Sequence, residues 1–445
     1  MGREFAYQAV YRYLDALIEE ASRGGQPRLP SLRALSRRLR VSLATVQTAY
    51  GLLENEGRVL SVPKSGYFAN PGLKAGRGVI PVGGQVGSAQ PLIEHALFAH
   101  ERRLARQRAR SMLASQGTGG ARLRHALAER YTRSSQQCWR PDDVHLGPDV
   151  QALLETLLAA LALQGSTVLV ASPCCWRLLR VLQRVGMRVL EVPLNDQGSP
   201  DLDSLTRLLG HEPVRMVIMP SCLGLPMGRL MPQQDQQQLA KLLALHPVWL
   251  LENDLDSEHC FTMPPGSRLR DWVDPHRLLV LGSLEAAVGV EAPYAYVLGR
   301  HTALAEAFAL RGFQLAPLRL QALAQLFSKG EIDEQLGRQR ADQHAHMQHF
   351  YQALQRHLGT QLGFTMPEGG RVVWVQLKQP VPTDRLVAAL AGSALLAVPG
   401  EQFSVQGRYQ RCLALTWAGE HSEGLVEPLY LLAQALELRC GVQLP

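Results

Sequence analysis

The segment LLVLGSLEAAVGVEAPYAYVLG, residues 278–299, decides which class of fold the chain adopts. It begins with an apolar run, passes through small residues, and ends in a second apolar run that closes at Gly299. Short apolar runs bounded by glycine are typical of buried strands. The segment therefore predicts two strands joined by a turn, and this turn offers Glu285, Ala286 and Ala287.

On both sides of this segment, strand patterns alternate with helical patterns. Apolar runs predict strands at residues 166–172, 188–194, 215–220, 248–254 and 277–283, and amphipathic stretches between them predict helices. Strands separated by helices favour a mostly parallel sheet that is covered on both faces, which is an α/β fold. From about residue 315, long helices come first, followed by strand-like stretches at 371–377 and 411–417 and a final helix.

Size and composition indicate a soluble protein with several domains. The 445 residues suit two or three domains, and 46% hydrophobic with 19% charged residues is ordinary for a globular protein. No apolar run is long enough to predict a membrane span. The first twenty residues carry acids and aromatics rather than an apolar signal core, so we expect a cytoplasmic location. Seven cysteines without CxxC spacing predict reduced thiols.

The net charge of +7 is unevenly distributed. Residues 1–70 contain ten basic and six acidic residues, a net charge of +4 in a small part of the chain. A basic end on a nearly neutral body favours a polyanionic partner.

The same seventy residues have the pattern of a winged helix-turn-helix. Apolar spacing predicts a helix over Tyr7–Ser22, and Ser31 is placed to cap a second helix that carries several arginines. Ser42 is placed to cap a third helix that ends at Gly57. Residues 58–69 predict a hairpin with residues 63–66 at its tip. Two short helices joined by a tight turn place the second helix in a DNA major groove.

This region resembles the GntR-type winged helix-turn-helix over some sixty positions. The matching stretches are LPSLR (29–33), VSLATV (41–46), AYGLLENEG (49–57) and SGYFA (65–69). The resemblance implies that a set of polar residues and one glycine lie against double-stranded DNA: Arg33, Ser42, Thr45, Gln47, Lys64 and Gly66. Arg33 and Lys64 suit phosphates, and Gln47 suits a base edge. Leu43 and Ala44 stand where some relatives carry arginine, which favours contact with thymine methyl groups.

A linker and a large body follow. Residues 71–90 hold six glycines and two prolines, which predicts a flexible tether. We expect domains at 1–70 and 91–445, the latter with a large part at about 141–315 and a C-terminal subdomain at about 316–445. The body resembles the fold-type I aminotransferases, which depend on pyridoxal phosphate. The matching stretches, in order, are GGARLRHALAERY (119–131), QGSTVLVASPCCW (164–176), PLNDQGSPDLDSL (193–205), PSCLGLPMG (220–228), LLENDLDSE (250–258) and LGSLEAAVG (281–289).

A GntR-type domain joined to such a body resembles the MocR-like transcriptional regulators. The resemblance implies a homodimer whose former active site lies at the subunit boundary. Several residues that bind the cofactor in the family pattern are replaced by other residues in this chain. The Schiff-base lysine falls at Ala286, the ring-nitrogen acid at Asn253 and its neighbouring tyrosine at Leu255. The phosphate arginine falls near Pro293, the glutamine before PxG at Gly224, and the substrate-carboxylate arginine near Ala414.

No other residue supplies the missing lysine. The chain has only Lys64, Lys74, Lys241, Lys329 and Lys378, and none of them is predicted at a strand end. Lys329 is expected to be a helix-end cation next to Gly330. We therefore predict no catalytic residues and no covalent pyridoxal phosphate, while noncovalent pyridoxal phosphate or another small ligand remains an alternative.

The remaining polar clusters favour simple structural roles. His344, His346 and His349 fit a solvated helix better than a metal site. The acids of LLENDLDSE lack EF-hand spacing. The arginines between 102 and 110 fit a helix surface, so no metal site is expected.

The leading hypothesis is a sequence-specific DNA-binding transcriptional regulator. Its aminotransferase-like body would serve dimerisation and the sensing of a small-molecule effector. One alternative is a regulator that binds pyridoxal phosphate, or an active aminotransferase with an appended DNA-binding domain. Another is a DNA-bound scaffold that has no ligand.

Overall fold

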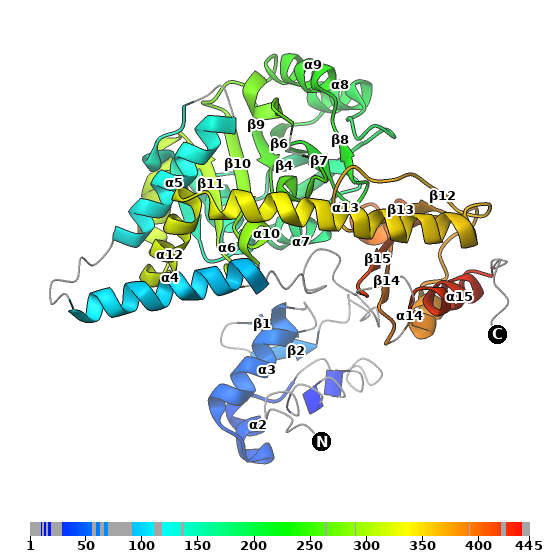
Figure 1. The fold of residues 1–445 in the computed structure, drawn as a ribbon, viewed down its shortest axis with the longest axis horizontal. Helices are drawn as coiled ribbons and strands as arrows, with labels where there is room; N and C mark the ends of the chain where they lie inside the picture. The colour runs from blue at the N-terminus through cyan, green and yellow to red at the C-terminus, as the bar shows by residue number, and fades with distance from the viewer. Residues whose placement is uncertain are drawn as a thin grey trace. The chain divides into compact units, whose positions relative to one another are not determined.

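The computed structural model of the chain describes residues 10, 13–14, 17–18, 29–55, 59–62, 66–69, 91–110, 118–134, 138–262, 265–289, 291–390, 392–419 and 424–437. The chain divides into two compact units, Met1–Val79 and Ile80–Pro445 (Figure 1). The predicted tether at 71–90 and most of the predicted helix Tyr7–Ser22 lie outside the described residues. The described residues of that helix are helical.

The amino-terminal unit consists of two helices followed by an antiparallel hairpin. Its elements are α2 (Leu32–Leu39), α3 (Leu43–Asn55), β1 (Val59–Val62) and β2 (Gly66–Ala69). Ser31 caps α2 as predicted, because its Oγ accepts a hydrogen bond from the Ala34 amide at 3.2 Å. Arg40, in the left-handed region with φ of 52°, ends α2 and turns the chain toward α3.

A small apolar core holds this unit together. Its buried side chains come from the first helix, the segment before α2, α2, α3 and β1, and are Val10, Leu14, Ile18, Leu29, Leu35, Val46, Ala49, Tyr50, Leu53 and Val59. The Tyr50 hydroxyl also donates a hydrogen bond to the Pro30 carbonyl at 2.5 Å. Apolar residues at helical spacing therefore face one another across the two helices, which leaves the arginines of α2 on the outside.

A seven-stranded sheet forms the centre of the second unit. In spatial order its strands are β3 (Val144–Gly147), β11 (Ala295–Gly299), β10 (Leu278–Ser283), β9 (Trp249–Asn253), β6 (Val214–Pro220), β4 (Thr167–Ser172) and β5 (Arg188–Pro193). All strands run parallel except β11, which is antiparallel to both of its neighbours. The predicted α/β class with a mostly parallel sheet is therefore confirmed.

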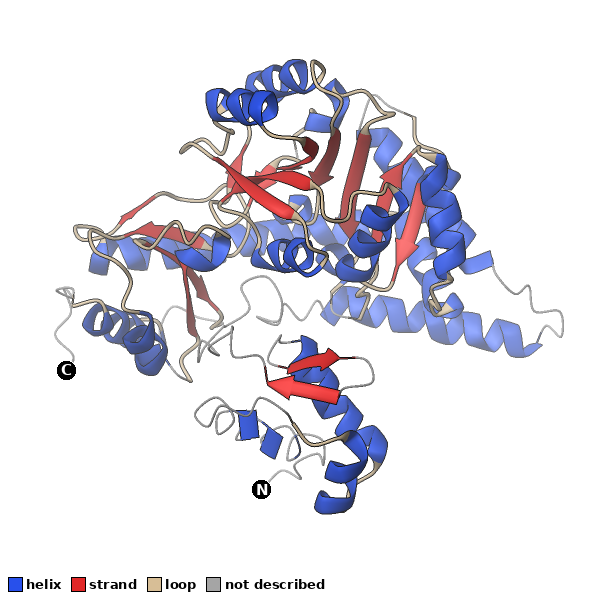
Figure 2. Cartoon of the chain, turned by 180° about the vertical axis from the view of Figure 1, so that it is seen from behind, coloured by secondary structure: helices blue, strands red, loops and turns tan. Residues whose placement is uncertain are grey.

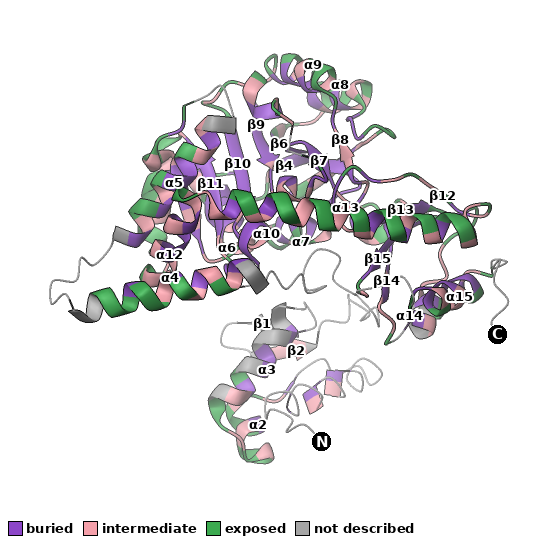
Figure 3. Cartoon of the chain, viewed as in Figure 1, coloured by how far each residue is buried: buried purple, intermediate pink, exposed green. Residues whose placement is uncertain are grey.

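Helices cover both faces of this sheet (Figure 2). One face packs against α4 (Pro91–Arg110), α5 (Thr118–Ser134), α8 (Leu202–His211), α9 (Gln233–Leu243) and α12 (Pro317–Ser328). The other face packs against α6 (Val150–Ala160), α7 (Trp176–Arg184) and α11 (Thr302–Arg311). Successive strand residues alternate between these two cores; Val217 and Met219 face one, and Met216 and Ile218 face the other. The inner strands of this sheet are almost wholly buried, whereas the outer faces of the helices are exposed (Figure 3).

The long helix α13 (Glu331–Leu358) leads to a second, antiparallel sheet (Figure 1). The order in this sheet is β12 (Gly363–Phe364), β13 (Val373–Gln376), β15 (Cys412–Trp417) and β14 (Leu395–Pro399). Its apolar cluster includes residues of α13, α14 (Thr383–Leu390) and α15 (Val426–Ala435). Strand β14 was not predicted from the sequence. None of the described helices combines the length and apolar character that a bilayer span requires.

Candidate functional site

The start of α3 presents a polar, preorganised surface. The Ser42 Oγ accepts a hydrogen bond from the Thr45 amide at 3.1 Å and lies 2.7 Å from the Thr45 hydroxyl oxygen. This bond satisfies one amide of the helix start, so the predicted capping role of Ser42 is confirmed. Because two hydroxyl groups share one hydrogen bond, the pair retains acceptor capacity at the amino end of the helix.

Other predicted DNA-contact residues lie on the same small unit. Arg33 on α2 and Gln47 on α3 are exposed, and Leu43 is 44% exposed although it is a large apolar residue. Gly66 pairs with Val62 as the first residue of β2, so it belongs to a strand and not to the hairpin tip as predicted. Lys64 lies outside the described residues. Arg33 is thus on α2, Ser42 directly precedes α3, and Thr45 and Gln47 are on α3.

In the second unit, the carboxyl ends of the strands meet at one edge of the sheet. The register places Asn253 of β9 beside Pro220 of β6 and Leu281 of β10. It places Ala295 of β11 between Ser283 of β10 and Gly147 of β3. Open sheets of this type bind ligands at the carboxyl ends of their strands. This edge is therefore the candidate ligand site of the unit.

The structure brings some of the predicted cofactor positions to this edge. Ala286 is in α10 (Glu285–Val288), a short helix that follows β10 and ends at Gly289 with φ of 101°. Asn253 is the last residue of β9, and its Oδ1 accepts a hydrogen bond from the Leu255 amide at 3.3 Å. Leu255 packs on the apolar core that includes α6 and α7.

The remaining three positions are more dispersed. Gly224 is in the hairpin formed by β7 (Leu223–Gly224) and β8 (Arg229–Leu230), and Pro293 is exposed before β11. Ala414 is buried on β15 of the second sheet, in an apolar cluster with Val398 and Phe403. None of these three residues carries a charge that could hold an anion.

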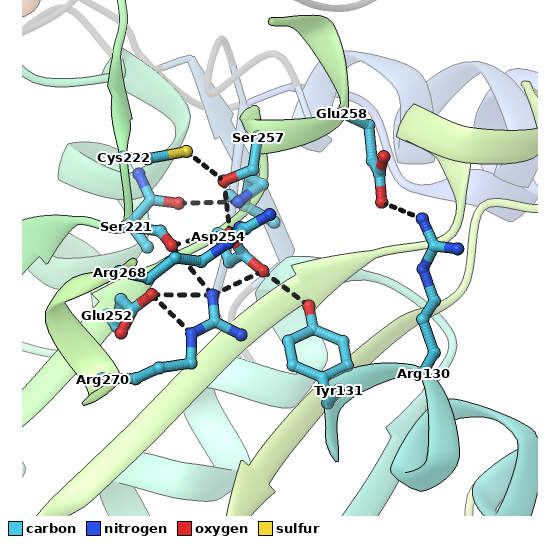
Figure 4. A network of polar contacts seen from close by, with 12 residues as sticks. Arg130, Tyr131, Ser221, Cys222, Glu252, Asp254, Ser257, Glu258, Arg268 and Arg270 are labelled. Carbon is cyan, nitrogen blue, oxygen red and sulfur yellow. Dashed lines mark hydrogen bonds and ion pairs between the residues drawn. The ribbon is translucent and has the colours of Figure 1, made fainter. Parts of the chain in front are cut away.

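A buried arginine–carboxylate network lies at the carboxyl end of β9, and sequence reasoning missed it. The Arg270 Nη2 lies 2.7 Å from Glu252 Oε1 and 2.8 Å from Asp254 Oδ2. The Arg268 Nη1 lies 2.7 Å from Asp254 Oδ1. Both arginines also donate to the Ser221 hydroxyl, at 2.8 and 3.4 Å (Figure 4). Two carboxylates and two guanidinium groups thus neutralise one another inside the protein.

The electrostatics of this network follow from burial and pairing. Burial alone would raise the pKa of Asp254, but Arg270 and Arg268 together hold it well below its ordinary value. The pKa of Glu252 is raised by burial in spite of Arg270. The Tyr131 hydroxyl of α5 donates to Asp254 at 2.6 Å and lies 2.8 Å from the Tyr296 hydroxyl. Asp254 is therefore a charged, saturated acceptor.

A second group of ion pairs ties this region to the flanking helices. Arg130 of α5 lies 2.7 Å from Glu258 and also pairs with Asp333 of α13. The Arg340 Nη2 of α13 lies 3.0 Å from Glu258 Oε2. The pair of Arg130 with Glu258 is drawn in Figure 4. Two of the acids that follow β9, Asp254 and Glu258, are therefore paired with arginines of the same chain.

The start of α6 lies at the same edge and is capped by its own carboxylate. Asp149 follows Gly147 and Pro148, and its Oδ1 accepts a hydrogen bond from the Ala152 amide at 2.7 Å. A helix amino terminus attracts anions through its free amide groups and its dipole. Here the Asp149 carboxylate caps the helix start and supplies a negative charge there.

The three lysines among the described residues are all exposed. Lys241 is on the surface of α9, and Lys378 follows β13. Lys329 forms the carboxyl cap of α12, as predicted, with its Nζ 3.8 Å from Glu331. None of the three lies at the carboxyl edge of the large sheet.

Two histidines of the 344–349 cluster have structural partners. The His346 Nε2 lies 3.1 Å from the Trp417 carbonyl oxygen, and the His344 ring stacks on Phe261. Across the described part of the chain, no three His, Cys, Asp or Glu residues are grouped so that they could hold a metal ion.

Glu191 connects the large sheet to the loop before β15. Its carboxylate accepts hydrogen bonds from the Ser172 hydroxyl at 2.9 Å, the Ser404 hydroxyl at 2.8 Å and the Val405 amide at 2.5 Å. Arg408 approaches it at 3.7 Å. A fully buried charge with this many donors fixes the two segments relative to each other.

Comparison with known proteins agrees with both units. Residues 6–68 match the family of bacterial regulatory proteins called the gntR family. The chain is 23% identical to the HTH-type transcriptional regulator YjiR of Escherichia coli (strain K12), over 97% of this chain and 98% of that protein. It is 25% identical to the probable rhizopine catabolism regulatory protein MocR of Rhizobium meliloti, over 99% of this chain and 95% of that protein.

A solved structure shares the fold of the second unit. LysN, the alpha-aminoadipate aminotransferase of Thermus thermophilus, superimposes with a TM-score of 0.66 and 24% identity, over 77% of this chain and 88% of that chain. This likeness establishes the aminotransferase fold.

Proposed function

Because the chain belongs to the MocR-like group of GntR-type transcriptional regulators, we propose that it binds a specific DNA operator as a homodimer, and that its aminotransferase-like unit has lost covalent pyridoxal phosphate chemistry. The proposal of DNA binding rests on the exposed polar side chains at the start of α3, in a unit that is basic. The second part is supported by the carboxyl edge of the large sheet, where the chain's own arginines neutralise the acids.

The exposed side chains of α2 and α3 suit a DNA duplex. Arg33 supplies a charge for a phosphate, and the paired hydroxyls of Ser42 and Thr45 suit backbone oxygens at the helix start. Gln47 is exposed two residues after Thr45 and suits a base edge in the major groove. Leu43, being apolar and exposed, favours a thymine methyl group over guanine. Lys64 and Gly66 of the wing complete the proposed interface.

We infer that the second unit lacks the groups that covalent pyridoxal phosphate requires. The cofactor needs a lysine amine, an acid that keeps its ring nitrogen protonated, and donors for its phosphate. The turn after β10 contains no lysine, and Asn253 is an amide where an acid is needed. Asp254 is committed to Arg268 and Arg270, and Asp149 places a negative charge at the start of α6.

A regulatory role for this unit follows from its architecture. We propose that two copies of the unit associate, so that two helix-turn-helix units reach paired half-sites on the DNA. A small-molecule effector would act by binding one arrangement of the dimer more tightly than another, since a ligand without such a preference shifts no equilibrium.

A mobility-shift assay tests the DNA-binding part of the proposal. The full chain should bind its own upstream DNA region, and binding should weaken steeply as salt is raised, because phosphate contacts release counterions. The Gln47→Ala variant should lose discrimination between operator and unrelated DNA. Gln238→Ala, which removes an exposed glutamine from α9 in the other unit, is the matched control and should bind as the wild type does. Equal affinity of the wild type for operator and unrelated DNA would refute sequence-specific regulation.

A further inference from the structure

Two buried thiols lie beside the arginine–carboxylate network. Cys222 comes between β6 and the β7–β8 hairpin, and Cys260 directly follows the short helical turn η2 (Ser257–His259). Both are free cysteines with fully buried side chains in one small cluster with Leu223. The Cys222 thiol donates to the Ser257 hydroxyl at 3.3 Å, and Ser257 in turn hydrogen-bonds Asp254 (Figure 4). Thirty-eight residues apart in sequence, the two thiols are neighbours in space.

The surroundings of the pair make the two thiols chemically unequal. Their proximity in this cluster lowers the pKa of Cys222 and raises that of Cys260. The Arg268 guanidinium also lowers the pKa of Cys222, against the effect of burial. By contrast, burial raises the pKa of Cys174 and of Cys412. Of the two buried thiols, Cys222 is therefore the one that loses its proton more readily.

We propose that Cys222 and Cys260 form a reversible disulfide when the protein meets a hydroperoxide. The attacking group is the Cys222 thiolate, and the resolving group is the Cys260 thiol. The proposal is independent of DNA binding, and it assigns a redox modification site to the carboxyl edge of the large sheet.

The chemistry balances with hydrogen peroxide as the oxidant. The Cys222 sulfur attacks one peroxide oxygen, the O–O bond breaks, and the product is a sulfenic acid with one molecule of water. The Cys260 sulfur then attacks the Cys222 sulfur, the S–O bond breaks, and a second water leaves. The two thiol protons end in the two waters, and the thiol pair gives two electrons to the O–O bond.

Access to the pair requires only a local opening. Leu225 and Leu230 pack against the thiol cluster, and they belong to or adjoin a hairpin whose strands, β7 and β8, have two residues each. On the other side, Cys260 forms a single bridge with Gly369. Short strands and single bridges open at a low free-energy cost compared with global unfolding. A small hydroperoxide can therefore reach the sulfurs without unfolding of the domain.

Peptide mapping of the full-length wild-type protein tests the proposal. The reduced protein is treated with hydrogen peroxide, its free thiols are blocked with an alkylating reagent under denaturing conditions, and it is digested with trypsin. The expected product is a cross-link between peptides 216–229 and 242–268, each of which contains one cysteine. Two of the seven cysteines should escape alkylation. Reduction with dithiothreitol should make both thiols available for alkylation again.

Variants identify the sulfurs and provide the control. Cys222→Ser and Cys260→Ser should each abolish the cross-link, whereas Cys412→Ser, which removes a buried cysteine from the second sheet, should leave it unchanged. The proposal is overturned if peroxide leaves peptides 216–229 and 242–268 fully alkylated. It is equally overturned if the disulfide joins another pair, such as Cys174 with Cys175, or if the only products are overoxidised cysteines. Because the decisive map uses the wild type, poor folding of a variant does not rescue the proposal.

Discussion

Replacing Arg270 with methionine tests whether the buried arginines stabilise the carboxyl edge of the large sheet. The Arg270 side chain is fully buried, and its Nη2 lies 2.7 Å from Glu252 Oε1 and 2.8 Å from Asp254 Oδ2. In the variant, Arg268 still faces Asp254 at 2.7 Å, but Glu252 loses its ion pair. Removal of one partner of a buried ion pair costs about 3–5 kcal/mol, because the remaining charge has no compensation. We expect the free energy of unfolding to fall by that amount.

Urea unfolding followed by tryptophan fluorescence measures this loss in the relevant unit. All six tryptophans lie at or after residue 139, so their emission reports the unit Ile80–Pro445. Arg338→Met is the matched control, since it breaks an exposed pair with Glu334 whose side chains are 63% and 67% exposed. Exposed pairs contribute about 0–1 kcal/mol. A loss for Arg270→Met no greater than that of the control would refute the reasoning.

The pH dependence of the same variant gives an independent check. In the wild type, the depressed pKa of Asp254 adds stability that is present above the unfolded-state value of about 3.9 and is lost as pH falls through the folded-state value. In Arg270→Met, the buried Glu252 carboxyl has no cation, so its folded-state pKa, already raised by burial, rises further. The penalty is then largest at neutral pH and shrinks as pH falls toward about 5. A difference between variant and wild type that grows on acidification contradicts this sign.

Three further changes have defined outcomes. Glu191→Gln removes the charge that binds Ser172, Ser404 and the Val405 amide, and it should lower the free energy of unfolding by about 1.5–3 kcal/mol, measured in urea. Glu401→Gln, at an exposed site near the same loop, should have little effect, and equal losses would argue against the role of Glu191. Arg33→Ala should weaken binding to all DNA sequences alike and reduce the slope of log affinity against log salt by about one, measured by fluorescence anisotropy; an unchanged slope excludes a phosphate contact. Leu43→Ala should weaken binding chiefly to operators with thymine at the contacted step, and uniform weakening would exclude a contact with a thymine methyl group.

Most of the fold could be predicted from local sequence patterns. The buried strands β6, β9 and β10 were predicted within a few residues, because continuous apolar runs of this length between helical segments are typical of strands buried on both faces. Ser31 and Ser42 were predicted as caps because helix starts leave amide groups that a hydroxyl satisfies. Strand β14 (Leu395–Pro399) was missed, although Gly392 and Ser393 separate its apolar run from the preceding helix and Gly400 follows it.

The candidate site was predicted only in part, because its chemistry comes from tertiary contacts. Arg270 is fully buried, yet in a one-dimensional pattern an arginine indicates a surface. Its partner network also includes Tyr131, which hydrogen-bonds Asp254 across 123 residues of sequence. The signal available in the sequence was the pair Arg268 and Arg270 close after three acids, which is a weak pattern. The approach of Cys222 to Cys260 likewise depends on where two strands end in the sheet.

Borohydride reduction in the presence of pyridoxal phosphate tests the central claim most directly. The wild-type protein is incubated with the cofactor, reduced, digested and mapped for pyridoxyl-lysine. Since the turn after β10 has no lysine and the described lysines of this unit are exposed on other elements, we predict no site-specific adduct and no aldimine absorption band before reduction. Stoichiometric labelling of one residue, whether Lys241, Lys329 or Lys378, together with an aldimine band, would contradict the loss of covalent cofactor chemistry.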